Sequence, residues 1–148
     1  MPVTRVASES DKKYAFRLYN TLFRPHIETI WGWDDRWQIT NFESEWQQFD
    51  TEIVEHNGIG IGYLQTEYRS DPLHLYLSII ALDSAYQGKG LGSSIMRGLT
   101  SRVEKQDIPL RLNVFRINPE ARRFYERLGF REVSTTESGV ILEWYGKF

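Results

Sequence analysis

The segment "YQGKGLGSSIM" (residues 86–96) is the part of the sequence whose residue types most clearly suggest chemistry. It places three glycines within five positions and then runs into an apolar helical pattern. Unpaired backbone N–H groups at the start of a helix, together with the positive end of its dipole, bind anions. Glycine permits close approach and positive φ there. The segment indicates a phosphate-binding loop, although a tight structural turn would use the same residues.

Two common phosphate-binding motifs do not match this loop. A Walker A loop requires Ser or Thr after its lysine, whereas Gly90 follows Lys89. A dinucleotide-binding fingerprint requires a third glycine where this loop has Ser93. It also requires an acidic residue at the end of the next strand, and in this chain that end, residues 113–116, contains no Asp or Glu. The pattern that remains is Q-x-x-G-x-G, formed by Gln87, Gly90 and Gly92.

A second motif follows downstream, and the two together identify a family. The motif is N-x-x-A-x-x-F-Y-x-x-x-G-F, and its residues are Asn118, Ala121, Phe124, Tyr125, Gly129 and Phe130. With "IIALDSAYQGKGLGSSIM" before it, the sequence resembles the GNAT superfamily of acetyl-coenzyme A-dependent N-acetyltransferases. The resemblance covers roughly residues 51–145. It departs from the family at Ser84, where proline is frequent.

The resemblance implies acetyl-CoA as the co-substrate. The pyrophosphate would be held by backbone N–H groups of the loop, and the pantetheine arm would run beside the end of the 73–82 strand. Asn118 would approach from the other side of a wedge between this strand and the next. The implied cofactor-binding residues are Ile80, Ala81, Leu82, Gln87, Gly88, Lys89, Gly90, Leu91, Gly92, Ser93 and Asn118.

Tyr125 is the implied catalytic residue. In the family, a tyrosine at this motif position protonates the departing thiolate, and a phenol of pKa about 10 is adequate for that role. On helical spacing alone, Tyr125 would be a core residue beside Phe124. The resemblance favours direct attack of an amine on the thioester in a ternary complex, and the absence of cysteine excludes an acyl-cysteine intermediate.

The acceptor side of the reaction is less defined. An alkylamine is mostly protonated at pH 7, and removing that proton costs roughly 4.6 kcal/mol, so a base or an equivalent is needed. The family often has Glu or His at the positions of Tyr76 and Ser78, and we expect these two residues to line the acceptor pocket. Glu67, His74 and Asn113 are weaker candidates for a base, and the sequence names none.

The segment "WGWDD" (residues 31–35) offers a second contribution to acceptor binding. Trp31, Trp33 and Asp34 combine apolar rings with a carboxylate, which suits an ammonium group through cation–π contact and charge. The same tryptophans could equally anchor the first two helices to the core.

The 73–82 strand positions both predicted sites. Its odd residues are all apolar and its even residues begin as polar, so one face is expected to be core. On a central strand the polar face would line a cavity, whereas on an edge strand it would be solvated. Downstream, Leu91, Ile95, Leu99 and Val103 predict an amphipathic helix after the loop.

The remaining elements complete a mixed α/β (α+β) pattern, for which the resemblance implies a central, mostly antiparallel, splayed sheet flanked by helices. The patterns predict a helix at 10–30 that fades at Pro25, a second capped by Asn41, and strands in 51–72 with a hairpin at Asn57-Gly58 and a turn at Asp71-Pro72. They also predict a strand at 108–115, a helix at 118–130 capped by Asn118, and a final strand pair turning at Ser138-Gly139.

Composition limits the function classes. The 148 residues are expected to form one domain, 1–148, and a net charge of −2 gives no footprint for nucleic acid or membrane. The lack of cysteine fits a cytoplasmic protein, and three histidines without ligand spacing predict no metal site. The expected partner is a small-molecule or peptide amine. The sequence does not determine the preferred acyl chain or the oligomeric state, for which a homodimer is one option. Two alternatives to an enzyme also stay open: a catalytically inactive acyl-CoA-binding module and a structural domain.

Overall fold

A seven-stranded sheet forms the centre of the molecule. The computed structural model describes residues 2–147, except for the side chain of His26. The strand order is β1-β2-β3-β4-β5-β7-β6, and every neighbouring pair is antiparallel except β4 and β5. The elements are β1 (Val3–Val6), η1 (Glu9–Asp11), α1 (Lys12–Ile30), α2 (Asp35–Gln48), β2 (Asp50–His56), β3 (Ile59–Arg69), β4 (His74–Leu82), η2 (Ser84–Tyr86), α3 (Leu91–Gln106), β5 (Leu110–Phe115), α4 (Pro119–Arg127), β6 (Arg131–Thr135) and β7 (Gly139–Trp144).

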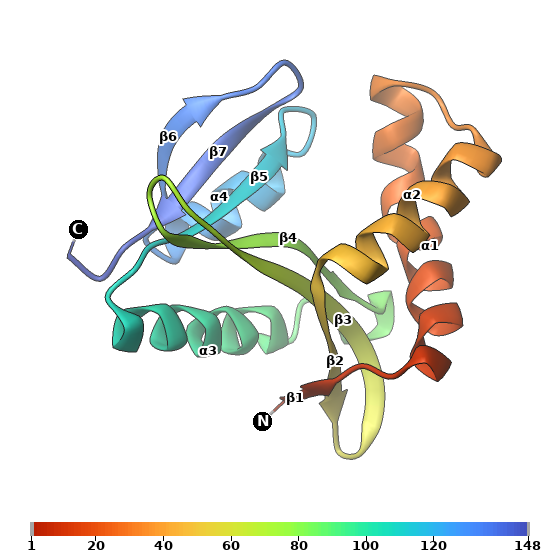
Figure 1. The fold of residues 1–148 in the computed structure, drawn as a ribbon, viewed down its shortest axis with the longest axis horizontal. Helices are drawn as coiled ribbons and strands as arrows, with labels where there is room; N and C mark the ends of the chain where they lie inside the picture. The colour runs from red at the N-terminus through yellow and green to blue at the C-terminus, as the bar shows by residue number, and fades with distance from the viewer. Residues whose placement is uncertain (1, 148) are drawn as a thin grey trace.

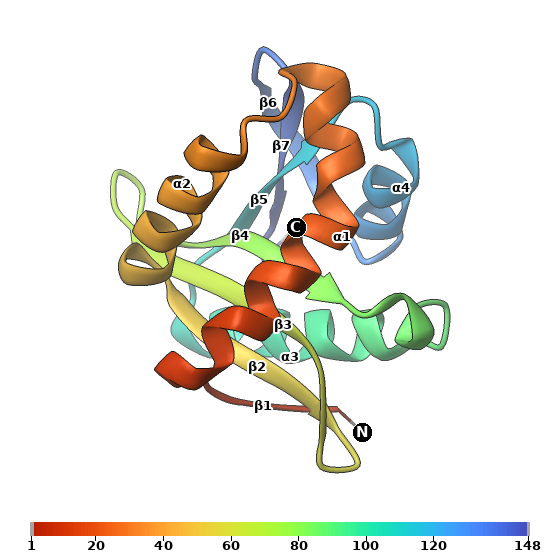
Figure 2. The same ribbon diagram turned by 90° about the vertical axis from the view of Figure 1, so that its right-hand side faces the viewer.

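Helices cover both faces of this sheet, as the predicted fold class requires. Helices α1 and α2 lie on one side and α3 and α4 on the other (Figures 1 and 2). The larger apolar cluster joins the sheet to α3 and α4, and the smaller one joins it to α1 and α2 through Ala15, Leu18 and Phe42. None of the described helices combines the length and the apolar character needed to cross a membrane.

Several predicted local features are confirmed. Asn57 and Gly58 both have positive φ, 54° and 77°, and connect β2 to β3 as a hairpin. The predicted stripe on α3 is buried at Ile95, Leu99 and Val103. Both features depend on residues that are close together in the sequence, which is why the sequence predicts them.

Helix α1 continues through Pro25 to Ile30, so the prediction that it fades at Pro25 is wrong. A proline inside a helix loses one backbone hydrogen bond and crowds the preceding turn. Ile27 lies beyond the proline and is buried, and this burial offsets the cost. The helix bends along its length (Figure 2), as proline-containing helices do.

Helix α2 begins earlier than predicted. Asp34 is its N-cap, and its Oδ1 accepts a hydrogen bond of 2.9 Å from the backbone N–H of Trp37. Asn41 was the predicted cap, but it lies inside the helix, where its amide donates to Glu45 Oε1 at 2.6 Å. The capping prediction for Asn41 is wrong because an aspartate seven residues upstream already satisfies the first turn.

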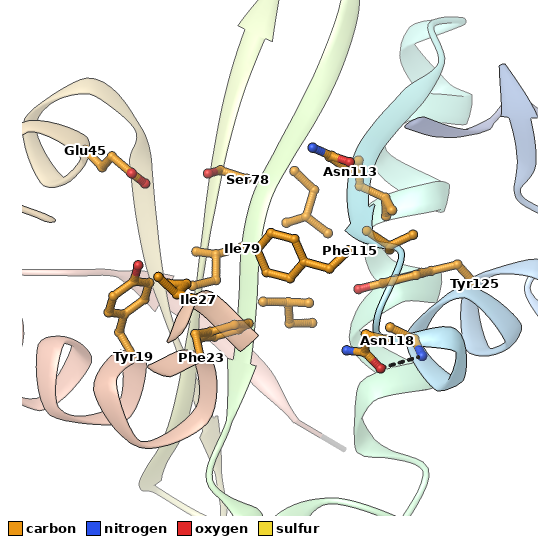
Figure 3. A pocket seen from close by; sticks show the side chains of 15 residues that line it. Tyr19, Phe23, Ile27, Glu45, Ser78, Ile79, Asn113, Phe115, Asn118 and Tyr125 are labelled. Carbon is orange, nitrogen blue, oxygen red and sulfur yellow. Dashed lines mark hydrogen bonds between the residues drawn. The ribbon is translucent and has the colours of Figure 1, made fainter. Parts of the chain in front are cut away.

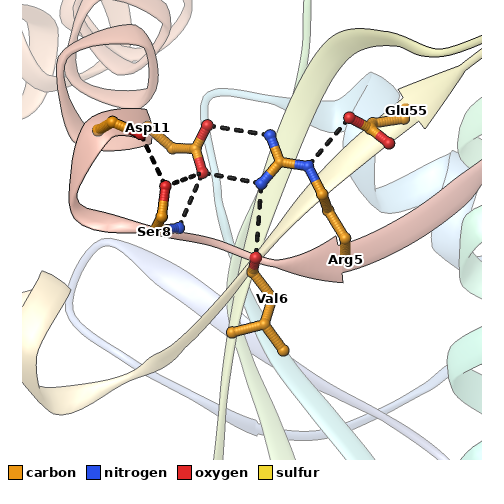
Figure 4. Close-up of polar contacts among 6 residues, drawn as sticks. Arg5, Val6, Ser8, Asp11 and Glu55 are labelled. Atoms are coloured by element: carbon orange, nitrogen blue, oxygen red, sulfur yellow. Dashed lines mark hydrogen bonds and ion pairs between the residues drawn. The ribbon is translucent and has the colours of Figure 1, made fainter.

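Strand β1 was not predicted from the sequence. It is an exposed edge strand, and side-chain contacts of Arg5 attach it to its neighbours (Figure 4). The guanidinium donates to Asp11 at 2.8 and 3.0 Å and to Glu55 at 2.9 Å. These contacts hold the pKa of the Asp11 carboxyl well below its usual range. The strand thus depends on partners distant in sequence, which alternation within four residues does not reveal.

Candidate active site

The candidate site lies where β4 and β5 separate. The two strands pair only between Leu75–Leu77 and Leu110–Leu112, and they diverge beyond that point. A cavity of about 260 Å³ occupies the wedge between them (Figure 3). It is lined by residues of α1, α2, β4, β5 and α4, namely Tyr19, Phe23, Ile27, Glu45, Leu77, Ser78, Ile79, Ile80, Leu112, Asn113, Val114, Phe115, Asn118, Ala121 and Tyr125.

A β-bulge at Ser78 shapes the β4 wall of this cavity. On β3, Thr66 pairs with Leu77 and Gln65 pairs with Ile79, so Ser78 has no partner of its own. A bulge inserts one residue and reverses the inward and outward alternation of the residues that follow it. Ser78 is thereby placed in the wall of the cavity, and its role in acceptor binding stays a prediction.

The bulge also makes one prediction wrong. The odd residues of the 73–82 strand do not share one face, because Leu75 and Leu77 pack in the larger core whereas Ile79 and Ala81 contact the smaller one. Leu73 is 55% exposed and precedes the strand. Alternation within a strand predicts its faces only where the pairing register is unbroken.

Helix α4 positions Tyr125. Asn118 caps this helix, its Oδ1 accepting from the backbone N–H of Ala121 at 3.2 Å, and Pro119 occupies the first turn, as predicted. Tyr125 is buried against Phe124 and Phe130, with ring centroids at 5.1 and 5.4 Å. The helix therefore fixes the ring, and the hydroxyl points into the cavity (Figure 3).

The Tyr125 hydroxyl is held in its protonated form. Burial raises its pKa well above the ordinary tyrosine value, because desolvation penalises the phenolate. Within the described part of the chain the hydroxyl has no hydrogen-bond partner. It is thus a proton donor aimed into an otherwise mostly apolar space. Tyr125 is both a core residue and a cavity residue, so the two interpretations of the sequence are compatible.

Glu45 is a cavity residue that the sequence did not single out. It projects from α2 and points across the cavity toward Ser78 (Figure 3). Burial raises the pKa of its carboxyl above the ordinary value, and the hydrogen bond from Asn41 offsets part of this shift. A glutamate on an amphipathic helix is expected to face solvent, and helical spacing does not separate Glu45 from the other charged residues of α2. Only the fold could therefore reveal its position in the cavity.

The glycine loop lies at the N-terminus of α3. Gly88 and Gly90 have φ of +74° and +78°, and a Cβ at either position would meet no atom within 4 Å, so the loop is open to a ligand. Gly90 is the N-cap, and no side chain caps the helix. The Gln87 amide donates to the carbonyl oxygen of Leu82 at 2.9 Å and thereby joins the loop to the end of β4. An uncapped helix start with an open glycine loop fits a phosphate group.

The structure separates some predicted site residues from the cavity. Tyr76 does not line it, and its ring instead packs against the guanidinium of Arg69 at 3.8 Å. Trp31, Trp33 and Asp34 line a second pocket of about 680 Å³ between α1 and α2, together with Ile27, Gly32, Trp37 and Gln38.

Several groups in this second pocket already have partners. Asp34 caps α2, the Trp33 Nε1–H donates to Asp35 at 2.7 Å, and the guanidinium of Arg24 lies 5.0 Å from the Trp33 ring. Trp31 is 62% exposed and contacts Phe115 edge-on, at 5.8 Å between centroids. Because Ile27 lines both pockets and Phe115 lines the first, the two pockets are adjacent.

The comparison with protein families identifies this arrangement. The model of the acetyltransferase (GNAT) family matches residues 13–130. The chain belongs to the GNAT acetyltransferase family. The match extends upstream of the sequence motifs and includes α1 and α2. GNAT membership confirms the predicted family and supports an acyltransferase enzyme.

Solved structures share the GNAT fold of this chain. PaiA N-acetyltransferase from Thermoplasma acidophilum, in complex with coenzyme A, is 16% identical, with a TM-score of 0.77 over 98% of this chain and 99% of that one. Naa50 from Arabidopsis thaliana, in complex with the bisubstrate analogue CoA-Ac-MVNAL, is 16% identical, with a TM-score of 0.70 over 97% of each chain. The ribosomal-protein-S18-alanine N-acetyltransferase from Escherichia coli is 23% identical, with a TM-score of 0.64 over 97% and 91%. No curated protein was found to match the chain in sequence.

Proposed function

We propose that this GNAT protein transfers the acetyl group of acetyl-CoA to a primary amine by direct attack in a ternary complex, with Tyr125 as the general acid. The observation that carries the proposal is the position of the Tyr125 hydroxyl, buried and directed into the wedge between β4 and β5. A general acid must lie within reach of the leaving group and keep its proton at the working pH. Burial of Tyr125 supports the second condition.

Residues on both sides of the wedge would bind acetyl-CoA. The backbone N–H groups of the loop from Gln87 through Ser93 would receive the pyrophosphate. The edge of β4 from Ile80 to Leu82, which β5 does not pair, would hydrogen-bond the pantetheine arm in the manner of an added strand, beside the Leu82 carbonyl that accepts from Gln87. Asn118 would contact the arm from the α4 side. Bound acetyl-CoA supplies the activated acyl group, and the chain orients it.

In the proposed reaction, the Tyr125 proton neutralises the charge that develops on the departing sulfur. The amine nitrogen forms a bond to the acetyl carbonyl carbon, and the carbon–sulfur bond then breaks. Tyr125 gives its proton to the sulfur as coenzyme A leaves. The nitrogen, which carries an extra proton after attack, returns one to the tyrosinate. The site thus regains its starting state and releases an amide and a free thiol.

The acceptor would enter from the α1 and α2 side. Ser78 lies at the bulge, where the cavity faces these helices. Trp31 and Trp33, with Asp34 at the rim, would take the body of the acceptor in the second pocket. Tyr76 would act from outside the cavity, by supporting the β4 wall.

Release of free thiol from acetyl-CoA, measured with a panel of primary amines, tests the proposal. We expect amine-dependent release and a product amide identified by mass. Tight binding of coenzyme A without turnover on any amine would instead favour the inactive acyl-CoA-binding module.

The variant Tyr125→Phe tests the acid role. We expect kcat to fall about 100-fold across the pH range, the usual size of a general-acid contribution, with little change in coenzyme A binding. Tyr68→Phe is the matched control, because Tyr68 is exposed and its hydroxyl contacts Gln106 outside the cavity. Near-normal turnover of Tyr125→Phe at all pH values would exclude Tyr125 as the acid.

A further inference from the structure

Glu45 is a partly buried carboxylate, and the described residues give it no cationic partner. The hydrogen bond that it accepts comes from the neutral amide of Asn41, at 2.6 Å to Oε1. Among the described residues no lysine, arginine or histidine forms an ion pair with it, whereas the neighbouring Glu43 pairs with Lys12 at 2.8 Å. A carboxylate withdrawn from water is costly unless a counter-charge accompanies it. Its position in the cavity wall therefore indicates that a cation comes from a ligand.

Aromatic residues surround this carboxylate. Tyr19 lines the same cavity, and its hydroxyl donates to Gln38 Oε1 at 3.0 Å. Burial raises the pKa of Tyr19, Tyr63 and Tyr76, and the nearby charge of Glu45 adds to the rise in each case. These tyrosines come from α1, β3 and β4, and they stay neutral over the pH range in which Glu45 titrates. A carboxylate among neutral aromatic rings suits an ammonium group.

We infer that Glu45 receives the ammonium group of the acceptor and takes its proton, and that the acceptor is a primary amine with no carboxylate beside the amino group. The inference rests on the proposed acetyl transfer and assigns its base. It moves ammonium recognition from Asp34, which caps α2, to the cavity beside Ser78.

The exclusion of a neighbouring carboxylate follows from the charges of the walls. The described residues that line the two pockets include no lysine, arginine or histidine. The carboxylate of an amino-acid acceptor would therefore lie near Glu45, while the guanidinium of Arg24, 5.0 Å from the Trp33 ring, is already paired with Glu28 at 2.6 Å. Like charges placed together at an interface cost several kcal/mol. An amine on an apolar body would instead contact Phe23, Ile27 and Phe115.

The proton balance of the step is simple. The ammonium group gives one proton to the Glu45 carboxylate, which leaves a neutral amine and a neutral carboxyl. The amine then attacks as described above, and Glu45 releases its proton to water after the product leaves. The overall reaction yields an amide, a thiol and one proton.

Glu45→Gln tests the base, with Glu43→Gln as a matched control on the same helix. Both remove one negative charge from α2, but Glu43 lies outside the cavity and pairs with Lys12. With phenethylamine as the acceptor, we expect Glu45→Gln to lower kcat/KM about 100-fold at neutral pH and to move the fall in kcat/KM toward acid pH up to the pKa of the free amine, about 10, because only the neutral amine can then react. Glu45→Asp should keep the acid limb of the wild type, and coenzyme A binding should be unchanged in all three variants. Wild-type kcat/KM with an unchanged acid limb in Glu45→Gln would overturn the inference.

Matched acceptors test the specificity. Phenethylamine and phenylalaninamide should be acetylated, whereas phenylalanine, which adds a carboxylate, should show a kcat/KM lower by on the order of 100-fold. Equal rates for phenylalanine and phenylalaninamide would overturn the exclusion of a neighbouring carboxylate.

A binding measurement separates this inference from the proposed function. The carboxyl carbon of Glu45, observed by NMR in the coenzyme A complex, should shift on addition of phenethylamine, and its pKa should fall as the ammonium binds. Phenylalanine should produce neither change. This readout needs no turnover, so it applies even if no amine is acetylated. An unmoved Glu45 signal at saturating phenethylamine would overturn the inference, while absent turnover with a shifted signal would contradict only the proposed function.

Discussion

Tyr125 and Glu45 lie on opposite sides of one cavity, and burial acts on both in the same direction. Desolvation favours the neutral form of each group, so both pKa values lie above their ordinary positions. For Tyr125 the consequence is a proton kept in place. For Glu45 the consequence is that the charged form of the carboxylate is poorly solvated. Perturbed groups of this kind gather at functional sites, where stability is often lower than the fold allows.

Glu45→Gln should therefore stabilise the free protein at neutral pH. A raised pKa in the folded state means that Glu45 contributes stability below its unfolded pKa and loses it as pH rises through the folded value. Glutamine carries no charge and can keep the contact from Asn41. The free energy of unfolding, measured with urea at several pH values, should favour the variant above this range and converge with wild type toward acid pH. A wild-type protein more stable than Glu45→Gln at neutral pH would show that the carboxylate has a favourable partner.

At the scale of elements, the loop and α3 form one functional unit. Gly90 has a left-handed conformation at the N-cap, where L side chains are strained. Gly98 lies within the same helix, is exposed, and has open space where a Cβ would be. An alanine is therefore expected to strain the backbone at position 90 and to fit without strain at position 98.

Gly90→Ala should lower the free energy of unfolding by about 1–2 kcal/mol and weaken coenzyme A binding. Gly98→Ala should raise the free energy of unfolding by about 1 kcal/mol, because alanine is the better helix former, and leave binding unchanged. Chemical denaturation and calorimetric titration with coenzyme A measure the two effects. Unchanged binding in a folded Gly90→Ala protein would count against the loop as the pyrophosphate site.

Elements fixed by local chemistry were predictable from the sequence. The Asn57-Gly58 hairpin, the Asn118 cap with Pro119, and the stripe of α3 each depend on neighbouring residues, and the structure contains all three. The predictions that failed concern features that depend on contacts between residues far apart in the sequence or in other elements. Pro25 stays helical because Ile27 is buried, and Ser78 forms a bulge because the register between β3 and β4 leaves it without a partner. Strand β1 depends on partners in η1 and β2.

At the scale of the molecule, the candidate site is assembled from both layers. The cavity takes residues from α1 and α2 on one face of the sheet and from α4 on the other, and it exists because β4 and β5 diverge. Motifs predicted the α4 and loop contributions, since each lies within a short segment. Glu45 could not be found in that way, because only the packing of α2 over the sheet brings it to Ser78.

The same two layers make the fold sensitive to alkaline pH. Burial raises the pKa of Tyr63 on β3 and Tyr125 on α4, and raises that of Tyr19 on α1 to about 12. Each group therefore contributes stability that is complete below the unfolded tyrosine pKa of about 10 and is lost as pH rises through the folded values. We expect the free energy of unfolding to fall above about pH 10, and the near-ultraviolet absorbance of tyrosinate to appear later in the native protein than in denaturant. Tyr19→Phe should reduce the loss of stability between about pH 10 and about pH 12, where Tyr19 itself titrates. If all tyrosines ionised together near pH 10 while the circular dichroism stayed native, the hydroxyls would be hydrated, and Tyr125 would not be the desolvated acid that the proposed reaction needs.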